Sequence, residues 1–227
     1  MTVGLIGYYH LAFFGGFIPY LALKSSRALA TRPYPPKVKY LTSQIITLTV
    51  FFVLSALVAR KEWIDLFPKA VPEPRMLALG AAVLVGLVVL MRPLWRERVE
   101  TRSRKVWLFM PRTRQERVLW TGVSIAAGVS EEVTYRGVMF AILWRLTGSA
   151  VAAALIAASI FAISHILQGW KSVTIIFGMA LAFQSLAWLS GSLYVSMVVH
   201  ALYDVTAGFC YGAYGEKLGY PIEPMPA

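Results

Sequence analysis

Residues 128–137 read GVSEEVTYRG and place two adjacent carboxylates and an arginine inside a long apolar stretch. An ionisable side chain at membrane depth costs roughly 2.5–3.5 kcal/mol on the scale from insertion experiments, so such groups need partners or a function. On a helix, residues four apart share a face, whereas adjacent residues are turned by about 100°. The spacing predicts an ion pair between Glu132 and Arg136 and leaves Glu131 as the free, working carboxylate. A purely structural cluster of the three charges is the alternative.

The composition indicates a polytopic membrane protein. Of the 227 residues, 58% are hydrophobic, and the mean hydropathy is +0.63. Both values are high for a soluble domain, and the apolar residues form long blocks. The length leaves no room for a separate soluble domain, so we expect one all-α integral-membrane domain over residues 1–227. The single cysteine, Cys210, excludes an intramolecular disulfide.

The net charge of +11 would suggest a nucleic-acid partner in a soluble protein. Here the basic residues lie between apolar segments, where they orient the chain and contact anionic lipid. We therefore expect the lipid bilayer as a partner and no nucleic acid.

We expect about seven spanning segments, with six to eight possible. They cover residues 4–23, 40–59, 76–94, 118–146, 150–167, 173–189 and 193–211. Two connections are strongly basic, a Pro-rich loop at 24–39 and a segment at 92–117. Within the second, we expect residues 95–117 to form an amphipathic helix that lies on anionic lipid headgroups. In the loop 60–75, by contrast, Glu62, Asp65 and Glu73 offset the basic residues. The positive-inside rule places both basic connections in the cytoplasm and the N-terminus outside, as expected of an uncleaved first helix.

The segment that carries the GVSEEVTYRG stretch is longer than a membrane span. A single helix over residues 117–147 would be about 46 Å long, against a hydrocarbon core of about 30 Å. The chain must tilt, protrude or break. Gly128 followed by Ser130 suggests a break, with the Ser130 hydroxyl capping a new helix whose first turn carries the two glutamates.

Two later segments carry further ionisable groups. His165 lies near the cytoplasmic end of the fifth segment, and His200 and Asp204 lie four apart on the seventh. Polar groups on three separate helices are better explained by one shared site than by three independent costs. The predicted depths place this site open towards the cytoplasm.

One carboxylate and two imidazoles suit the activation of water. Glu131, positioned with His165, could act as a general base for attack on an amide carbonyl, while His200 and Asp204 stabilise the oxyanion or protonate the leaving amine. Alternatively, Glu131, His165 and His200 could bind a divalent metal such as Zn²⁺ in an open three-ligand site. The sequence has no His-Glu-x-x-His pair, so it does not demand a metal.

Three patterns occur in order on successive segments: Glu131-Glu132-x-x-x-Arg136, Phe161-x-x-x-His165 and His200-x-x-x-Asp204. Over about residues 115–212 the chain thereby resembles the CAAX-protease and bacteriocin-processing (CPBP, or Abi) family, which includes the Rce1-type prenyl-protein endopeptidases. The resemblance implies intramembrane proteolysis with Glu131 and His165 activating water and with His200 and Asp204 on the oxyanion side.

Rce1-type members have asparagine at the position of Asp204, and a carboxylate donates no hydrogen bond unless it is protonated. A role of Asp204 in orienting His200 or holding a metal therefore fits better. The family is described both as metalloproteases and as metal-free glutamate proteases, and the residues leave both open.

The resemblance also bears on partners and location. The implied substrate is a membrane protein, a prenylated CAAX-type tail, or a leader or bacteriocin peptide. The composition is typical of a bacterial inner-membrane protein. Two other classes remain, a non-catalytic scaffold or bacteriocin immunity protein and a proton-coupled transporter, but an unpaired Glu131 and the lack of a visible sequence repeat favour an enzyme.

Overall fold

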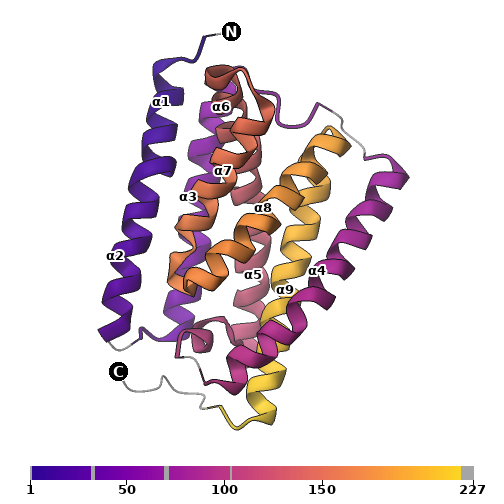
Figure 1. The fold of residues 1–227 in the computed structure, drawn as a ribbon. Coiled ribbons are helices and arrows are strands. Elements are labelled where there is room, and N and C mark those ends of the chain that lie inside the picture. Colours follow the sequence, from indigo (N-terminus) through magenta and orange to yellow (C-terminus); the bar gives the residue numbers. More distant parts are fainter. Residues whose placement is uncertain (1, 32–33, 69–71, 103, 221–227) are drawn as a thin grey trace.

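The apolar blocks form helices because backbone groups in hydrocarbon must be hydrogen-bonded within their own segment. The computed structural model describes residues 2–31, 34–68, 72–102 and 104–220, and in this part of the chain seven helical rods form an all-α bundle (Figure 1). The elements are α1 (Leu5–Ala12), η1 (Phe13–Phe17), α2 (Ile18–Thr31), α3 (Lys37–Lys61), α4 (Pro74–Glu100), η2 (Arg104–Phe109), α5 (Arg114–Glu131), η3 (Glu132–Met139), α6 (Phe140–Thr147), α7 (Ala150–Ser164), η4 (Ile166–Gln168), α8 (Trp170–Ser190) and α9 (Tyr194–Lys217). The first rod is the continuous run α1–η1–α2, and the fourth is α5–η3–α6, where η1 and η3 are π-helical.

Four of the described helical stretches are long and apolar enough to cross a membrane: Leu5–Ala28, Lys37–Lys61, Pro74–Glu100 and Trp170–Ser190. The other three rods are short or carry the ionisable groups singled out above. α7 has only 15 residues, and the fourth and seventh rods hold the two glutamates, Arg136, His200 and Asp204. The fold is nevertheless the expected helical membrane bundle, with charged side chains on its inner helices.

α5 is the central helix, since it packs against both α3 and α9. Its start is fixed by a capping box, in which the Thr113 hydroxyl accepts from the Glu116 backbone N–H and the Glu116 side chain reaches back. Glu116 also pairs with the buried Lys37 at 3.2 Å, which ties the beginning of α3 to the beginning of α5. α4 lies along α9 at the edge of the bundle, and its outer face exposes large apolar side chains to lipid.

The opposite end of the bundle is held by Glu62, which is only 5% exposed. Its carboxylate accepts hydrogen bonds from the backbone N–H groups of Gly4 and Gly7, both at 3.1 Å, and so caps the start of α1. The Arg145 guanidinium donates to the Glu62 carbonyl oxygen at 2.9 Å and lies 3.5 Å from its carboxylate. One side chain thus joins α1, the end of α3 and α6.

The basic connections are shorter than expected. α2 continues to Thr31 and α3 begins at Lys37, so little of the predicted loop at 24–39 is a loop, and residues 32–33 lie outside the described part. The stretch 95–117 is not one helix either, because α4 extends to Glu100 and the 3₁₀-helical η2 follows. Apolar residues from this stretch are buried against the protein, among them Trp107 and Met110 at 2% and 0% exposure, instead of lying on lipid.

The predicted break at Gly128 and Ser130 is wrong. Ser130 lies inside α5, and Glu131 has helical backbone angles of −72° and −35° with no side-chain cap. The chain instead widens into the π-helical η3 and then continues as α6. The length of the segment is thus absorbed by one continuous rod through the middle of the bundle.

Candidate active site

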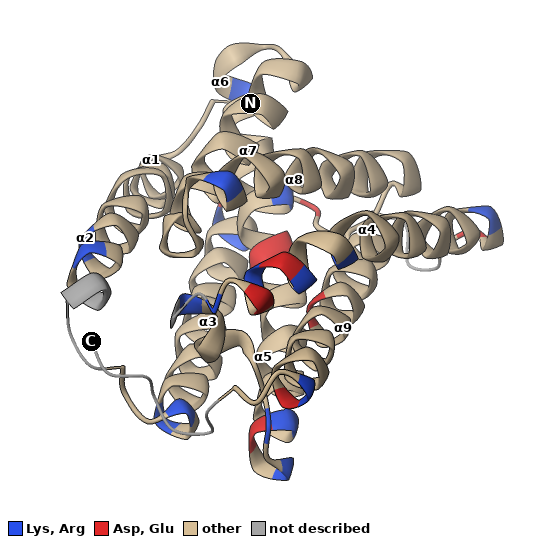
Figure 2. Cartoon of the chain, turned by 60° about the horizontal axis from the view of Figure 1, so that its bottom comes forward, with Lys and Arg blue, Asp and Glu red and all other residues tan. Residues whose placement is uncertain are grey.

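Glu131, Glu132 and Arg136 of the fourth rod lie inside the bundle. Figure 2, a view from the lower end of Figure 1, shows acidic and basic segments close together in the middle of the helices. The Arg136 guanidinium lies 3.3 Å from the Glu132 carboxylate, with side-chain exposures of 2% and 0%. This is the ion pair expected from the spacing, and it is fully withdrawn from solvent and lipid.

Two phenylalanines enclose Arg136. Its guanidinium carbon lies 4.1 Å from the ring centre of Phe161 on α7 and 5.6 Å from that of Phe183 on α8. A guanidinium over an aromatic face is stabilised by the ring quadrupole, most strongly where water is excluded. The pair is therefore held by three helices, and Phe161 acts here as a packing surface for the arginine.

Glu132 has a second partner on α9. The Nδ1 atom of His200 lies 2.9 Å from Glu132 Oε1, and an ionised carboxylate can only accept, so Nδ1 carries the proton that it donates. The imidazole also stacks on Phe183, with ring centres 5.0 Å apart and an interplanar angle of 24°. These two contacts fix the ring and direct its Nε2 atom away from Glu132.

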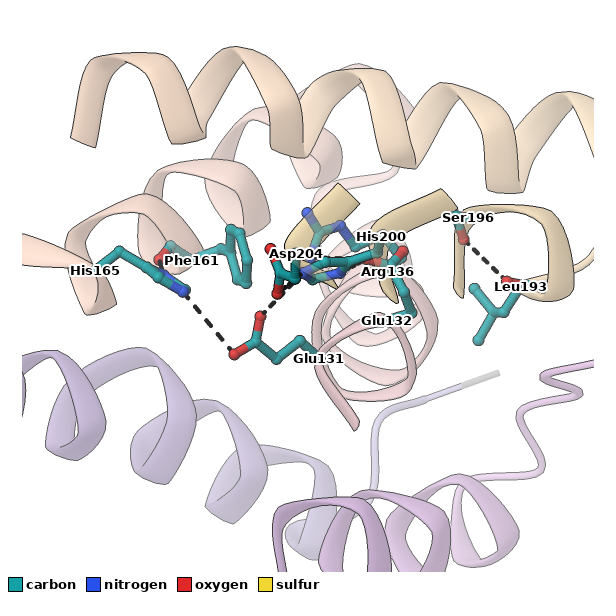
Figure 3. Close-up of polar contacts among 9 residues, drawn as sticks. All are labelled: Glu131, Glu132, Arg136, Phe161, His165, Leu193, Ser196, His200 and Asp204. Atoms are coloured by element: carbon teal, nitrogen blue, oxygen red, sulfur yellow. Dashed lines mark hydrogen bonds and ion pairs between the residues drawn. The ribbon is translucent and has the colours of Figure 1, made fainter. Parts of the chain in front are cut away.

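Glu131 lies between the two histidines. One carboxylate oxygen is 3.7 Å from His200 Nε2 and the other is 3.9 Å from His165 Nε2 (Figure 3). Glu131 and His165 are partly accessible, with side-chain exposures of 16% and 23%. Unlike Glu132, Glu131 has no basic partner that is permanently charged within 4.0 Å among the described residues.

The protonation pattern of His165 follows from its backbone contact. Its Nδ1 atom lies 2.9 Å from the carbonyl oxygen of Phe161, one turn earlier, and a carbonyl can only accept. Nδ1 is therefore the donor, and in the neutral ring the Nε2 lone pair faces Glu131. The His165 ring also packs on the Phe161 ring at 4.5 Å, so one residue sets both its tautomer and its orientation.

Asp204 completes the group from α9. Its Oδ2 atom lies 3.6 Å from His200 Nε2, and its side chain is 31% exposed. The Asp204 backbone carbonyl accepts a hydrogen bond from Trp120 of α5 at 2.9 Å. Both Glu131 and Asp204 thus approach the same imidazole nitrogen, which has a carboxylate on either side of it.

The close approach of α5 and α9 depends on Gly128. A Cβ atom at this position would lie 2.8 Å from the Met197 carbonyl oxygen and 2.9 Å from the Ala201 Cβ atom. Glycine at this position thus allows α5 and α9 to touch, and it does not break the helix as predicted. One turn later the same face of the rod presents Glu132 to His200.

The three residues named as ligands in the metal alternative, Glu131, His165 and His200, do not converge on one point. No group of three metal-ligating side chains in the described part of the chain is arranged to hold a metal ion. Ligands of a tetrahedral zinc at 2.0–2.2 Å lie roughly 3.3–3.5 Å apart. Glu131 instead uses different oxygens towards His165 and His200, at 3.9 and 3.7 Å. As placed here, the three residues do not fit a zinc site.

Every residue singled out from the sequence therefore lies in one cluster, with a buried part and an accessible part. The buried part is Glu132, Arg136 and Phe161, and the accessible part is Glu131, His165 and Asp204, with His200 between them. Sequence reasoning missed Phe183, because a phenylalanine in an apolar helix has no distinguishing signal. It also missed the hydrogen bond from His200 to Glu132, which depends on how two helices are rotated.

A family model described as type II CAAX prenyl endopeptidase, Rce1-like, matches residues 113–206, a range that contains all seven of these residues. No curated protein matched the chain, and no solved structure matched it.

Proposed function

We propose that this chain, whose residues 113–206 match the Rce1-like type II CAAX prenyl endopeptidase model, is an intramembrane endopeptidase. In this proposal Glu131 is the general base that activates water for peptide hydrolysis. The observation that carries this proposal is the contrast between the two neighbouring glutamates. Glu132 is fully buried in an ion pair, whereas Glu131 is partly exposed and faces two imidazoles. A carboxylate without a fixed cation is free to take up a proton.

The spacing of Glu131 and His165 suits a bridging water. Both facing atoms are acceptors, 3.9 Å apart, and a water that donates one O–H to each of two acceptors spans about 4 Å or slightly more. Such a water has its oxygen lone pairs directed away from both residues. His165 thereby positions the nucleophile, while Glu131 removes its proton.

The reaction then balances with the residues present. Water oxygen bonds to the scissile carbonyl carbon as its proton moves to Glu131, and the carbonyl becomes an oxyanion. A protonated His200 Nε2 can donate to that oxyanion, and Glu132 holds the ring in place through Nδ1. Collapse of the intermediate breaks the C–N bond, and the proton on Glu131 passes to the leaving amine. Asp204, with its Oδ2 atom 3.6 Å from His200 Nε2, helps to orient the protonated ring by charge attraction.

The substrate follows from the location of the site. We infer a membrane-bound peptide, either a prenylated CAAX-type tail or a leader or bacteriocin peptide, that reaches the accessible side of the cluster. We further infer a bacterial inner-membrane location with the N-terminus outside and the site open to the cytoplasm. The excess of basic residues at 24–39 and 92–117 supports that orientation.

The test is cleavage of a library of membrane-tethered peptides by purified wild-type protein and by the variant Glu131→Gln. Glutamine keeps the size of the side chain and cannot take up the proton, so we expect a rate loss of about 10²–10⁴-fold with unchanged folding. Glu216→Gln, an exposed change on α9, is the matched control and should retain full activity. Wild-type rates in Glu131→Gln would refute the assignment of the base.

A further inference from the structure

Arg60 and Lys61, in the last turn of α3, lack the acidic partners that the sequence suggested. Glu62 is turned inward onto the start of α1. Asp65 accepts a hydrogen bond from the backbone N–H two residues later, at 3.0 Å. Glu73 pairs with the arginine that follows two residues after it. In the part of the chain that the structure describes, neither Arg60 nor Lys61 forms an ion pair.

The two free cations line one cavity. It has a volume of about 520 Å³ and is bounded by Leu57, Arg60, Lys61 and Trp63. The cavity lies at the end of α3, and Figure 1 shows that end leading into the connection to α4. Leu57 and Trp63 are 52% and 83% exposed. Trp63 has a φ angle of +54°, a left-handed conformation that turns the chain sharply after the helix.

The position of the residues matches the boundary of a membrane. α3 is one of the helices that can cross a membrane, and Leu57 lies one turn inside its end. Tryptophan and basic residues are enriched at this level, where an apolar body can lie in hydrocarbon while a polar group reaches the headgroups. Cations in the last turn also complement the helix dipole, but this accounts only for their place on the helix and leaves their side chains free.

We propose that this cavity binds the phosphate headgroup of an anionic membrane lipid. The Arg60 guanidinium can hold two phosphate oxygens at once, and Lys61 adds a second positive charge. The Trp63 ring and Leu57 provide apolar surface for the glycerol region and the first part of an acyl chain. The cavity contains none of the residues of the peptidase cluster, so lipid binding here is separate from peptide hydrolysis.

A lipid is the source of the phosphate because half of the lining is apolar and exposed. A free phosphate ion would use Arg60 and Lys61 alone and would make no use of the apolar surface of Leu57 and Trp63. A phospholipid uses all four residues and arrives from the bilayer that already surrounds α3.

The experiment reconstitutes the full chain in vesicles of phosphatidylcholine and phosphatidylglycerol, with bromine on the acyl chains of one lipid at a time. The difference in fluorescence quenching between wild type and Trp63→Phe isolates the signal of Trp63. This quenching yields the ratio of the association constant for phosphatidylglycerol to that for phosphatidylcholine. We expect a ratio of about 30 for two cations acting on one anionic headgroup.

The double variant Arg60→Gln/Lys61→Gln should bring that ratio close to one. Its matched control is Arg114→Gln/Arg117→Gln, which removes the same charge from exposed positions at the other end of the bundle and should leave the ratio unchanged. A wild-type ratio near one, or an equal fall in the control variant, would overturn the proposal. Excess inorganic phosphate should leave the ratio unchanged, and its loss would show that a free anion occupies the cavity instead of a lipid.

Discussion

Replacing Glu132 with glutamine removes one negative charge from the middle of the bundle and changes almost nothing in shape. The carboxylate serves two partners at once, Arg136 at 3.3 Å and His200 Nδ1 at 2.9 Å. In Glu132→Gln the guanidinium stays buried between two aromatic rings with no acid beside it. The amide oxygen can still accept from His200, but without the attraction of a full charge.

The cost can be worked from the burial. Breaking a buried ion pair by removing one partner costs about 3–5 kcal/mol, because the other charge is left uncompensated. For a chain of this size, 1 kcal/mol corresponds to about 2–4 °C in Tm, so we expect Glu132→Gln to melt about 6–20 °C below wild type. Replacing both partners, as in Glu132→Gln/Arg136→Met, removes the stranded charge and should recover a large part of this loss.

The assay is thermal unfolding of the detergent-purified protein, followed by the fraction that still elutes as a monodisperse peak after heating. Glu216→Gln controls for the loss of an exposed glutamate. Peptidase activity is measured in parallel below the transition, where the weakened hold on His200 should lower kcat more than it raises KM. A Tm for Glu132→Gln within 2 °C of wild type would refute the coupling of the buried pair. So would a Tm for the double variant that falls by the sum of the decreases in Glu132→Gln and Arg136→Met.

Three further predictions follow from contacts around the site. Gly128→Ala should lose about 1–3 kcal/mol of stability and most of the activity, because the added Cβ atom would push α9 away from Glu131. A variant with the wild-type Tm and rate would contradict the close approach of α5 and α9. Phe183→Leu should lose the stacking on the His200 imidazole, worth about 0.5–1.5 kcal/mol, and should have a lower kcat, whereas Phe183→Tyr should keep much of the wild-type rate. Equal rates in the leucine and tyrosine variants would show that the aromatic ring does not contribute. A strong chelator should leave cleavage unchanged, because the ligands do not converge, and a loss of activity that zinc restores would show that a metal takes part.

Much of the arrangement was predictable, because the constraints were local or costly. The pairing of Glu132 with Arg136 follows from a four-residue spacing on one helix, and it survives the change from α- to π-helical geometry. The gathering of His165, His200 and Glu131 follows from the expense of ionisable groups in hydrocarbon, which leaves few options other than a common site.

The remaining details depended on neighbours that the sequence does not specify. Gly128 suits both a helix break and a close helix crossing, and only the position of α9 decides between them. The bond from His200 to Glu132, rather than to Asp204 alone, requires knowledge of the rotation of α9 about its axis. The basic stretch at 95–117 was expected on lipid because its charges are conspicuous, whereas its buried Trp107 and Met110 determine where it packs.

The cap on α1 has a consequence for the order in which the chain is assembled. The first helix leaves the ribosome early, but the carboxylate that satisfies the N–H groups of Gly4 and Gly7 belongs to residue 62, and the guanidinium beside that carboxylate belongs to residue 145. During synthesis the amide groups at the start of α1 therefore lack this partner until residue 62 has been made, and the contact with Arg145 can form only later still. Insertion of this helix and the completion of its cap are therefore separate events in time.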